Sequence, residues 1–296
     1  MVLIMRKYFF QLYKSLFLFI LILGFSASCS PDSDSLPDGP MVARDIINEA
    51  YGTDSRQVLD VFLPAGRSTE STPILLYIHG GGWIDGSKEE FLQFKEAIRI
   101  SFPDYAFVAI NYRLFDFTTN ANRFPTQEND VIKAINYIKN KTNEWDVSDQ
   151  LILAGASAGG HLALLHGYKH QPIGNIKAVI AFFPPTDLPS LYSFNLLTQL
   201  GLKELLGGSP QDQPNAYLDS SPSSYIRSAV VPTIIFHGTS DTVVPVWQSD
   251  IFTEKLKEVS AKYEYKRIEN QGHGFTDQTY SQAFKDAADF LQKNLK

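Results

Sequence analysis

The chain has 296 residues, of which 44% are hydrophobic and 20% are charged, and its formal net charge at pH 7 is −6. This length suits one large domain or two small ones, and the apolar content excludes a disordered or collagen-like chain. The only cysteine, Cys29, excludes an intramolecular disulfide and any metal site built on several cysteines. The acidic balance argues against nucleic acid or anionic lipid as the main partner.

Residues 1–28 have the pattern of a lipoprotein-type signal peptide. Residues 16–25 form an unbroken apolar run, and the cations before it are Arg6, Lys7 and Lys14. A run of this length is too short to span a bilayer, which takes about 20 residues, but it suits the core of a signal peptide. An N-terminal anchor helix is the alternative interpretation, although Lys14 interrupts it.

Small residues precede Cys29 in the sequence Ser26-Ala27-Ser28. This pattern resembles the lipobox of bacterial lipoproteins, a family in which the cysteine becomes the first mature residue and carries the acyl chains. The polar, proline-containing segment 29–40 indicates a flexible tether. We therefore expect an exported bacterial lipoprotein, periplasmic or at the cell surface, that contacts the membrane only through a lipid on Cys29. Removal of the leader, which holds three cations and no anion, lowers the formal net charge from −6 to −9.

From residue 41 onward, strand-like and helix-like runs alternate. Strands are expected at residues 42–47, 58–63, 74–79, 106–111, 151–154, 178–183, 233–237 and 263–268, and helices at residues 89–101, 128–140, 158–169, 246–260 and 280–292. The later strands are apolar throughout, as a sheet covered on both faces requires. The pattern predicts one α/β domain over residues 41–296, with helices on both faces of a mostly parallel sheet.

Residues 188–226 break this alternation after the sixth strand. The segment is rich in leucine and tyrosine and contains Gly207-Gly208. An insertion of this length is expected either to be a small lid over a pocket or to be a packing helix with a surface loop. In the first case its aromatic side chains would contact a bound ligand, and in the second they belong to the core.

A Gly-x-Ser-x-Gly motif, Gly155 to Gly159, follows the fifth strand and opens the next helix. A serine on a sharp strand-to-helix turn needs glycine on both sides, because side chains there would collide with neighbouring elements. The turn also directs helix N–H groups at the place where negative charge would form. The motif predicts Ser157 as a nucleophile, and a tight turn with a capping serine is the alternative.

The third strand ends in His79-Gly80-Gly81-Gly82-Trp83. Consecutive glycines allow backbone N–H groups to approach a substrate oxygen without a side chain between them. With the N–H of Ala158, they would form an oxyanion hole, and a flexible glycine turn is the alternative. Both glycine motifs follow the carboxyl ends of strands, where α/β sheets bind their ligands.

A serine nucleophile needs a base, and the base needs a carboxylate to orient it. Of the six histidines, His273 lies in the loop after the last strand, from which it can reach over the sheet. Asp241 follows the preceding strand, and Asp187, after the sixth strand, is the competing carboxylate unless it caps the next helix. The chain order Ser157, Asp241, His273 is that of α/β-hydrolases.

Six motifs occur in the order in which they are found in a known family. They lie at residues 59–64, 79–88, 111–114, 124–130, 155–163 and 243–245. The chain resembles the α/β-hydrolase superfamily, and within it the carboxylesterases related to bifunctional feruloyl and acetyl xylan esterases and to hormone-sensitive-lipase-like esterases. The resemblance implies an α/β-hydrolase fold with a lid-like insertion at residues 188–226. It also implies Ser157, Asp241 and His273 as the catalytic residues, an oxyanion hole from the N–H groups of Gly81, Gly82 and Ala158, and no metal or organic cofactor.

We therefore expect a serine carboxylesterase that hydrolyses short-chain acyl esters through an acyl-enzyme. Acetyl or feruloyl groups on plant polysaccharide are the expected substrates, because polymers cannot enter the cell and a tethered enzyme can reach them. Two other functions remain open. One is a different triad hydrolase, such as an aryl-formamidase, lipase or exopeptidase, and the other is an inactive hydrolase fold that binds ligands at the cell surface.

Overall fold

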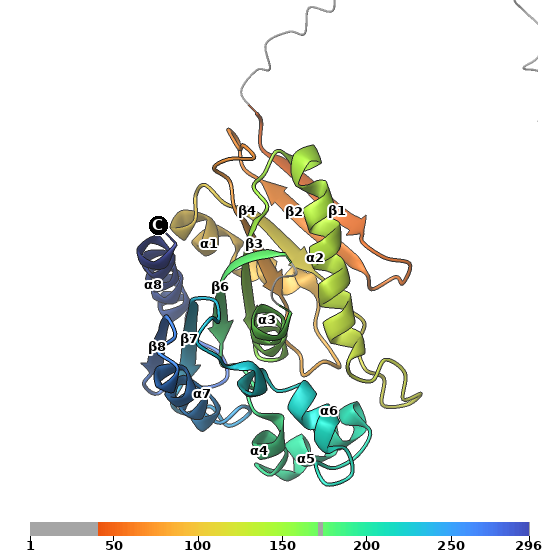
Figure 1. Ribbon diagram of the computed structural model, residues 1–296. Helices are drawn as coiled ribbons and strands as arrows, with labels where there is room; N and C mark the ends of the chain where they lie inside the picture. Colours follow the sequence, from red (N-terminus) through yellow and green to blue (C-terminus); the bar gives the residue numbers. More distant parts are fainter. Residues whose placement is uncertain (1–40, 171–173, 296) are drawn as a thin grey trace, which may run out of the picture. The chain divides into compact units, whose positions relative to one another are not determined.

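A sheet of eight strands lies at the centre of the computed structural model, which describes residues 41–170 and 174–295 (Figure 1). The strands are β1 (Arg44–Ala50), β2 (Val58–Leu63), β3 (Ile74–Ile78), β4 (Ala106–Ile110), β5 (Gln150–Ala156), β6 (Asn175–Phe182), β7 (Thr233–Gly238) and β8 (Tyr263–Ile268). Their order in the sheet is β1-β2-β4-β3-β5-β6-β7-β8. β2 runs antiparallel to β1 and β4, and all the other neighbours are parallel.

Helices cover both faces of this sheet. They are η1 (Lys88–Gln93), α1 (Lys95–Ser101), α2 (Thr126–Trp145), α3 (Ala158–Lys169), α4 (Leu188–Tyr192), α5 (Leu196–Leu206), α6 (Pro214–Asp219), η2 (Pro222–Tyr225), α7 (Trp247–Glu258) and α8 (Asp277–Asn294). One apolar core joins the sheet to α2, α3 and α7, and the other joins it to η1, α1 and α8. The predicted fold class, a mostly parallel sheet between two helical layers, is confirmed.

The inner strands are apolar because neither of their faces meets water. Every residue of β3 and β4 is buried. β1 differs because it is an edge strand and most of its residues are exposed. A bulge between Ile46 and Glu49 shifts its register, and Asn48 there adopts a left-handed φ of 59°. This irregularity lies where the predicted strand, 42–47, ended too early.

The predicted helix at residues 89–101 is wrong as one continuous element. A 3-10 helix, η1, directs Phe91 into the core, and the α-helix begins only after Phe94. The segment predicted as an insertion holds three short helices, α4, α5 and α6, and the turn η2. They lie beyond the carboxyl ends of the parallel strands (Figure 1).

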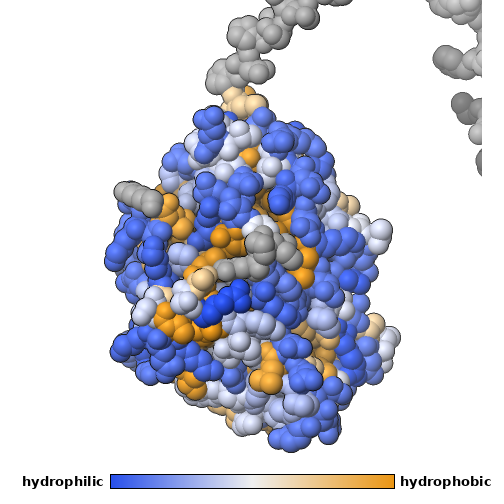
Figure 2. All heavy atoms as spheres, viewed as in Figure 1, coloured by the Kyte–Doolittle hydropathy of each residue, from blue (hydrophilic) through white to orange (hydrophobic). Residues whose placement is uncertain are grey.

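The face shown in Figure 2 is mostly hydrophilic, with small hydrophobic patches between polar regions. Within residues 41–170 and 174–295, no helix combines the length and the apolar character needed to cross a membrane. The predicted signal peptide at 1–28, the tether at 29–40 and the lipid attachment residue Cys29 lie outside the described residues.

Candidate active site

Ser157 occupies the sharp turn between β5 and α3, with φ 52° and ψ −121°. A left-handed φ is costly for a residue with a side chain and persists only where the surroundings enforce it. Two glycines allow the neighbouring backbone to pack closely around this turn. A Cβ on Gly155 would lie 2.5 Å from the carbonyl carbon of Gly159, and a Cβ on Gly159 would lie 2.0 Å from the carbonyl oxygen of Ile78. A side chain at either position would therefore collide with backbone, which is the reason for glycine that the motif predicted.

The structure brings Ser157, His273 and Asp241 together. His273 Nε2 lies 2.9 Å from Ser157 Oγ, and His273 Nδ1 lies 2.7 Å from Asp241 Oδ2. An ionised carboxylate can only accept hydrogen bonds, so Nδ1 carries the ring proton. Nε2 is then left with a lone pair directed at the serine hydroxyl. This is the arrangement in which a histidine can remove a proton from serine.

Asp241 is held ionised by the groups around it. Its Oδ1 accepts hydrogen bonds from the N–H groups of Val243 at 2.8 Å and Val244 at 3.0 Å. Oδ2, which accepts from His273, also lies 3.3 Å from Nε2 of the buried His237. Burial by itself raises the pKa of Asp241, but the hydrogen bonds from His237, His273 and the Val243 N–H outweigh it and hold the pKa well below its usual range.

Two loops that pack closely against each other position the acid beside the base. The loop after β7 contains Asp241, and the loop after β8 contains His273. The N–H of Ser240 donates to the carbonyl oxygen of Gln271 at 2.9 Å. A Cβ on Gly238 would lie only 2.2 Å from the same oxygen, so the close approach depends on glycine there. The ring of Phe183 packs on His273 with 4.6 Å between ring centroids.

The glycine loop after β3 turns sharply beside Ser157. Gly81, Gly82 and Trp83 have positive φ values of 97°, 60° and 65°. Within the described chain, no backbone carbonyl accepts a hydrogen bond from the N–H of Gly82 or Ala158. Both residues line the same pocket as Ser157. Gly81 is not among the described residues that line it. Its carbonyl closes a turn by accepting from the N–H groups of Ile84 and Asp85.

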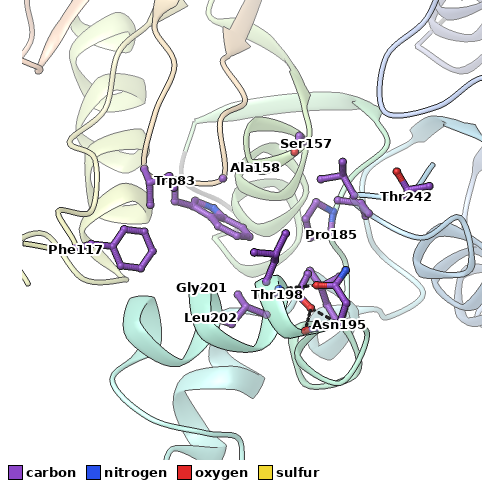
Figure 3. Close-up of a pocket in the computed structure, with 16 residues that line it drawn as sticks. Trp83, Phe117, Ser157, Ala158, Pro185, Asn195, Thr198, Gly201, Leu202 and Thr242 are labelled. Carbon is purple, nitrogen blue, oxygen red and sulfur yellow. Dashed lines mark hydrogen bonds between the residues drawn. The ribbon is translucent and has the colours of Figure 1, made fainter.

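A pocket of about 340 Å³ opens beside the Ser157 hydroxyl. Figure 3 shows Ser157 on one side of it and Asn195, Thr198, Gly201 and Leu202 on the facing side. The predicted insertion therefore contributes a wall of the pocket, through α4 and α5. Most of the remaining lining is apolar and comes from the glycine loop, Pro185 and the segment Thr242–Val244.

A family model described as BD-FAE matches residues 59–256. The chain belongs to the BD-FAE family. The matched range includes the glycine loop, Ser157 and Asp241, and it ends before His273. The six sequence motifs thus identified the right group of proteins.

Several curated relatives of this BD-FAE family member carry esterase names. Esterase LipC of Mycobacterium tuberculosis is 28% identical over 244 residues, which cover 76% of this chain and 58% of LipC. Isoprenylcysteine alpha-carbonyl methylesterase ICME of Arabidopsis thaliana is 26% identical over 252 residues, which cover 78% of this chain and 56% of ICME. The chain thus spans about half the length of the curated relatives it matches.

Two solved structures resemble the BD-FAE chain over most of its length. A bifunctional GH43-CE protein from Bacteroides eggerthii gives a TM-score of 0.73 at 25% identity, covering 85% of this chain and 38% of that one. A truncated carbohydrate esterase from gut microbiota gives a TM-score of 0.71 at 22% identity, covering 86% and 97%. The α/β-hydrolase fold expected from the sequence is confirmed by these likenesses together with the sheet order.

Several family motifs meet beneath the glycine loop. The hydroxyl of Tyr112 donates to the carbonyl oxygens of His79 and Gly80, at 3.0 and 3.2 Å, and its ring stacks on that of His79. Lys88 is buried and pairs with Asp60 at 2.8 Å. These contacts give a structural reason for motifs that lie far apart in the sequence, because together they hold the loop in place.

The competing carboxylate, Asp187, is not beside the base. It caps α4 by accepting from the N–H of Ser190 at 3.0 Å, and it accepts from Ser223 Oγ at 3.0 Å. The alternative use of Asp187 as a helix cap is thus the correct one. No group of three or more His, Cys, Asp or Glu side chains that could hold a metal ion occurs within residues 41–170 and 174–295.

Two residues near the site were not predicted. Nε2 of His237 lies 3.3 Å from Oδ2 of Asp241, and the ring of Phe183 packs on that of His273. The only sequence signal for His237 is its place at the end of β7, four residues before the acid. Phe183 directly follows the apolar strand β6 and has no polar atom in its side chain, so nothing in the sequence distinguishes it from an ordinary core residue.

Proposed function

We propose that this chain is a serine carboxylic ester hydrolase. The observation that carries the proposal is the position of His273, whose two ring nitrogens contact Ser157 and Asp241 at 2.9 and 2.7 Å. The esterase names of the curated relatives support the same reaction class.

In the proposed reaction, Ser157 Oγ attacks the acyl carbon while His273 Nε2 takes its proton. The N–H groups of Gly82 and Ala158, with that of Gly81 from the same loop, stabilise the oxyanion. His273 then gives the proton to the leaving alcohol, and an acyl-enzyme remains on Ser157. Water attacks this ester in the same way and releases the acid.

We propose acylated plant polysaccharide, with acetyl or feruloyl groups, as the natural substrate. A carbohydrate esterase and a bifunctional GH43-CE protein are among the structural neighbours, which supports a carbohydrate ester. Export with a lipid on Cys29 would place the enzyme where such polymers occur. Metabolic labelling with radioactive palmitate tests the anchor, and the label should be lost in Cys29→Ala.

The purified full-length chain tests the reaction class. We expect hydrolysis of p-nitrophenyl acetate, and we expect Ser157→Ala to lower kcat by at least about 10³-fold. Ser101→Ala, on the other side of the sheet, is the matched control and should keep full activity. Acetyl-xylan tests the carbohydrate ester, and methyl ferulate tests the feruloyl group as the acyl part. Cleavage of only an N-formyl or peptide substrate would replace this proposal with the formamidase or peptidase alternative.

A further inference from the structure

Gly201 lies in the interior of α5 with no structural need to be glycine. Glycine weakens a helix interior relative to alanine, so a glycine at such a position usually serves packing or function. The backbone at Gly201 is helical, and a Cβ added there would meet no heavy atom within 4 Å. Gly155 and Gly159 differ, because a Cβ on either would collide with backbone.

The space in front of Gly201 is the pocket beside Ser157 (Figure 3). Leu197, Thr198 and Leu202 from the same side of α5 also line it. A side chain at position 201 would therefore take volume from the pocket without disturbing the packing of the helix. This makes pocket volume the feature that glycine preserves.

The wall formed by α5 suits an apolar group. Asn195 and Thr198 are its polar members, and their side chains bond each other's backbone in a capping box, at 2.9 Å and 3.1 Å. Large apolar side chains at the pocket are also exposed to solvent, with 82% of Leu197 and 52% of Val243 accessible. An apolar chain bound there would cover them and gain from leaving water.

The position of His273 decides which half of an ester this pocket holds. His273 must give a proton to the leaving alcohol, so the alcohol lies next to His273. His273 is not among the described residues lining the pocket, whereas Gly82 and Ala158 are. The pocket therefore lies on the acyl side of the scissile bond. This step rests on the proposed esterase function.

We propose that Gly201 keeps the acyl site open, so that the chain accepts apolar acyl groups much larger than acetyl. Gly201 acts as a specificity-determining residue because it sets the volume available to the acyl chain. Of the two acyl groups proposed above, the larger feruloyl group would then be the natural one, and acetate would be the poorer substrate.

Two series of esters test this inference on the full-length protein. The first keeps p-nitrophenol and varies the acid from acetate to butyrate and octanoate, and methyl ferulate adds an aromatic acid. The second keeps acetate and varies the alcohol from phenol to 1-naphthol. We expect wild-type kcat/KM to be higher for octanoate than for acetate. In Gly201→Leu the octanoate-to-acetate ratio should fall at least tenfold, while the alcohol series should keep its order.

Matched variants keep the result interpretable. Gln199→Leu adds the same side chain to an exposed position of α5 outside the pocket, and its ratio should equal that of wild type. Gly201→Ala should raise the melting temperature and lower the ratio by less than Gly201→Leu, so it answers the question if the leucine variant does not fold. An unchanged ratio in both Gly201 variants, or a change confined to the alcohol series, would overturn the inference and leave the esterase proposal intact. If wild type hydrolysed no ester in either series, the proposed function itself would fail.

Discussion

A single carboxylate oxygen of Asp241 faces two histidines. His273 contacts it at 2.7 Å, and His237 lies 3.3 Å away while also contacting the Val244 carbonyl oxygen at 2.9 Å. Because a carbonyl can only accept, His237 Nε2 carries a proton and holds the loop that contains Asp241. The chain order predicted the pairing of Asp241 with His273. It could not predict His237, because the order of residues does not reveal how many donors a buried carboxylate needs.

Replacing Asp241 by asparagine tests its role without changing its shape. The amide can present its NH₂ group to His273 Nδ1, which would move the ring proton to Nε2 and leave no lone pair for Ser157. We expect kcat on p-nitrophenyl acetate to fall by about 10⁴-fold, as in other triads. Asp187→Asn is the matched control because it changes the competing carboxylate. An equal loss of kcat in the two variants would contradict the assignment.

Among the elements, the buried strands were the most predictable. β3 and β4 are apolar at every position, and their predicted ends lie within one residue of the observed ones. The helices of the insertion were not predicted individually. In α5, leucines lie on all sides, since Leu196, Leu197 and Leu200 are exposed whereas Leu202, Leu205 and Leu206 are buried. Such a pattern has no clear apolar face, so periodicity could not define the helix.

The insertion is joined to the glycine loop through one buried side chain. His161 Nε2 lies 2.7 Å from the carbonyl oxygen of Ser220, and its Nδ1 accepts from Trp83 Nε1 at 3.3 Å. The carbonyl fixes the proton on Nε2, and the indole N–H requires a lone pair on Nδ1. A neutral imidazole therefore links the insertion, α3 and the loop beside Ser157. The sequence places His161 in the helix expected at residues 158–169, but nothing in it reveals this link.

His161→Leu should break this link and leave two buried polar groups without partners. Each such group costs about 1–3 kcal/mol, so we expect the free energy of unfolding to fall by at least about 2 kcal/mol. Urea denaturation at pH 7 measures it. His161→Gln serves as the control, because its amide can both donate to Ser220 and accept from Trp83. If the leucine and glutamine variants were equally stable, the two hydrogen bonds would have no such role.

At the scale of the whole molecule, buried neutral histidines make stability depend on pH. Burial lowers the pKa of His79 and of His161 to about 4. In the unfolded chain a histidine has a pKa of about 6.5. Below that value the unfolded state binds protons that the folded state does not take up until about pH 4. Stability from these groups is therefore complete above pH 6.5 and declines as the pH falls toward 4.

Between pH 7 and pH 5, each of these histidines should lower the free energy of unfolding by about 2 kcal/mol. Denaturation curves of the wild type at the two pH values should show the sum of both effects. His161→Gln removes one of the two titrating groups, so its loss over the same interval should be smaller by about 2 kcal/mol. An identical loss in the wild type and in this variant would show that His161 is not the buried neutral group described above.

The central claim is that His273 and Asp241 make Ser157 a nucleophile that forms an acyl-enzyme. A fluorophosphonate reacts only with such an activated serine, and it leaves a stable adduct at the position of the acyl group. Mass spectrometry of the treated full-length chain should show one adduct, on the peptide that contains Ser157, and none in Ser157→Ala. An unmodified wild-type protein, or equal labelling of the Ser157→Ala variant, would contradict the account.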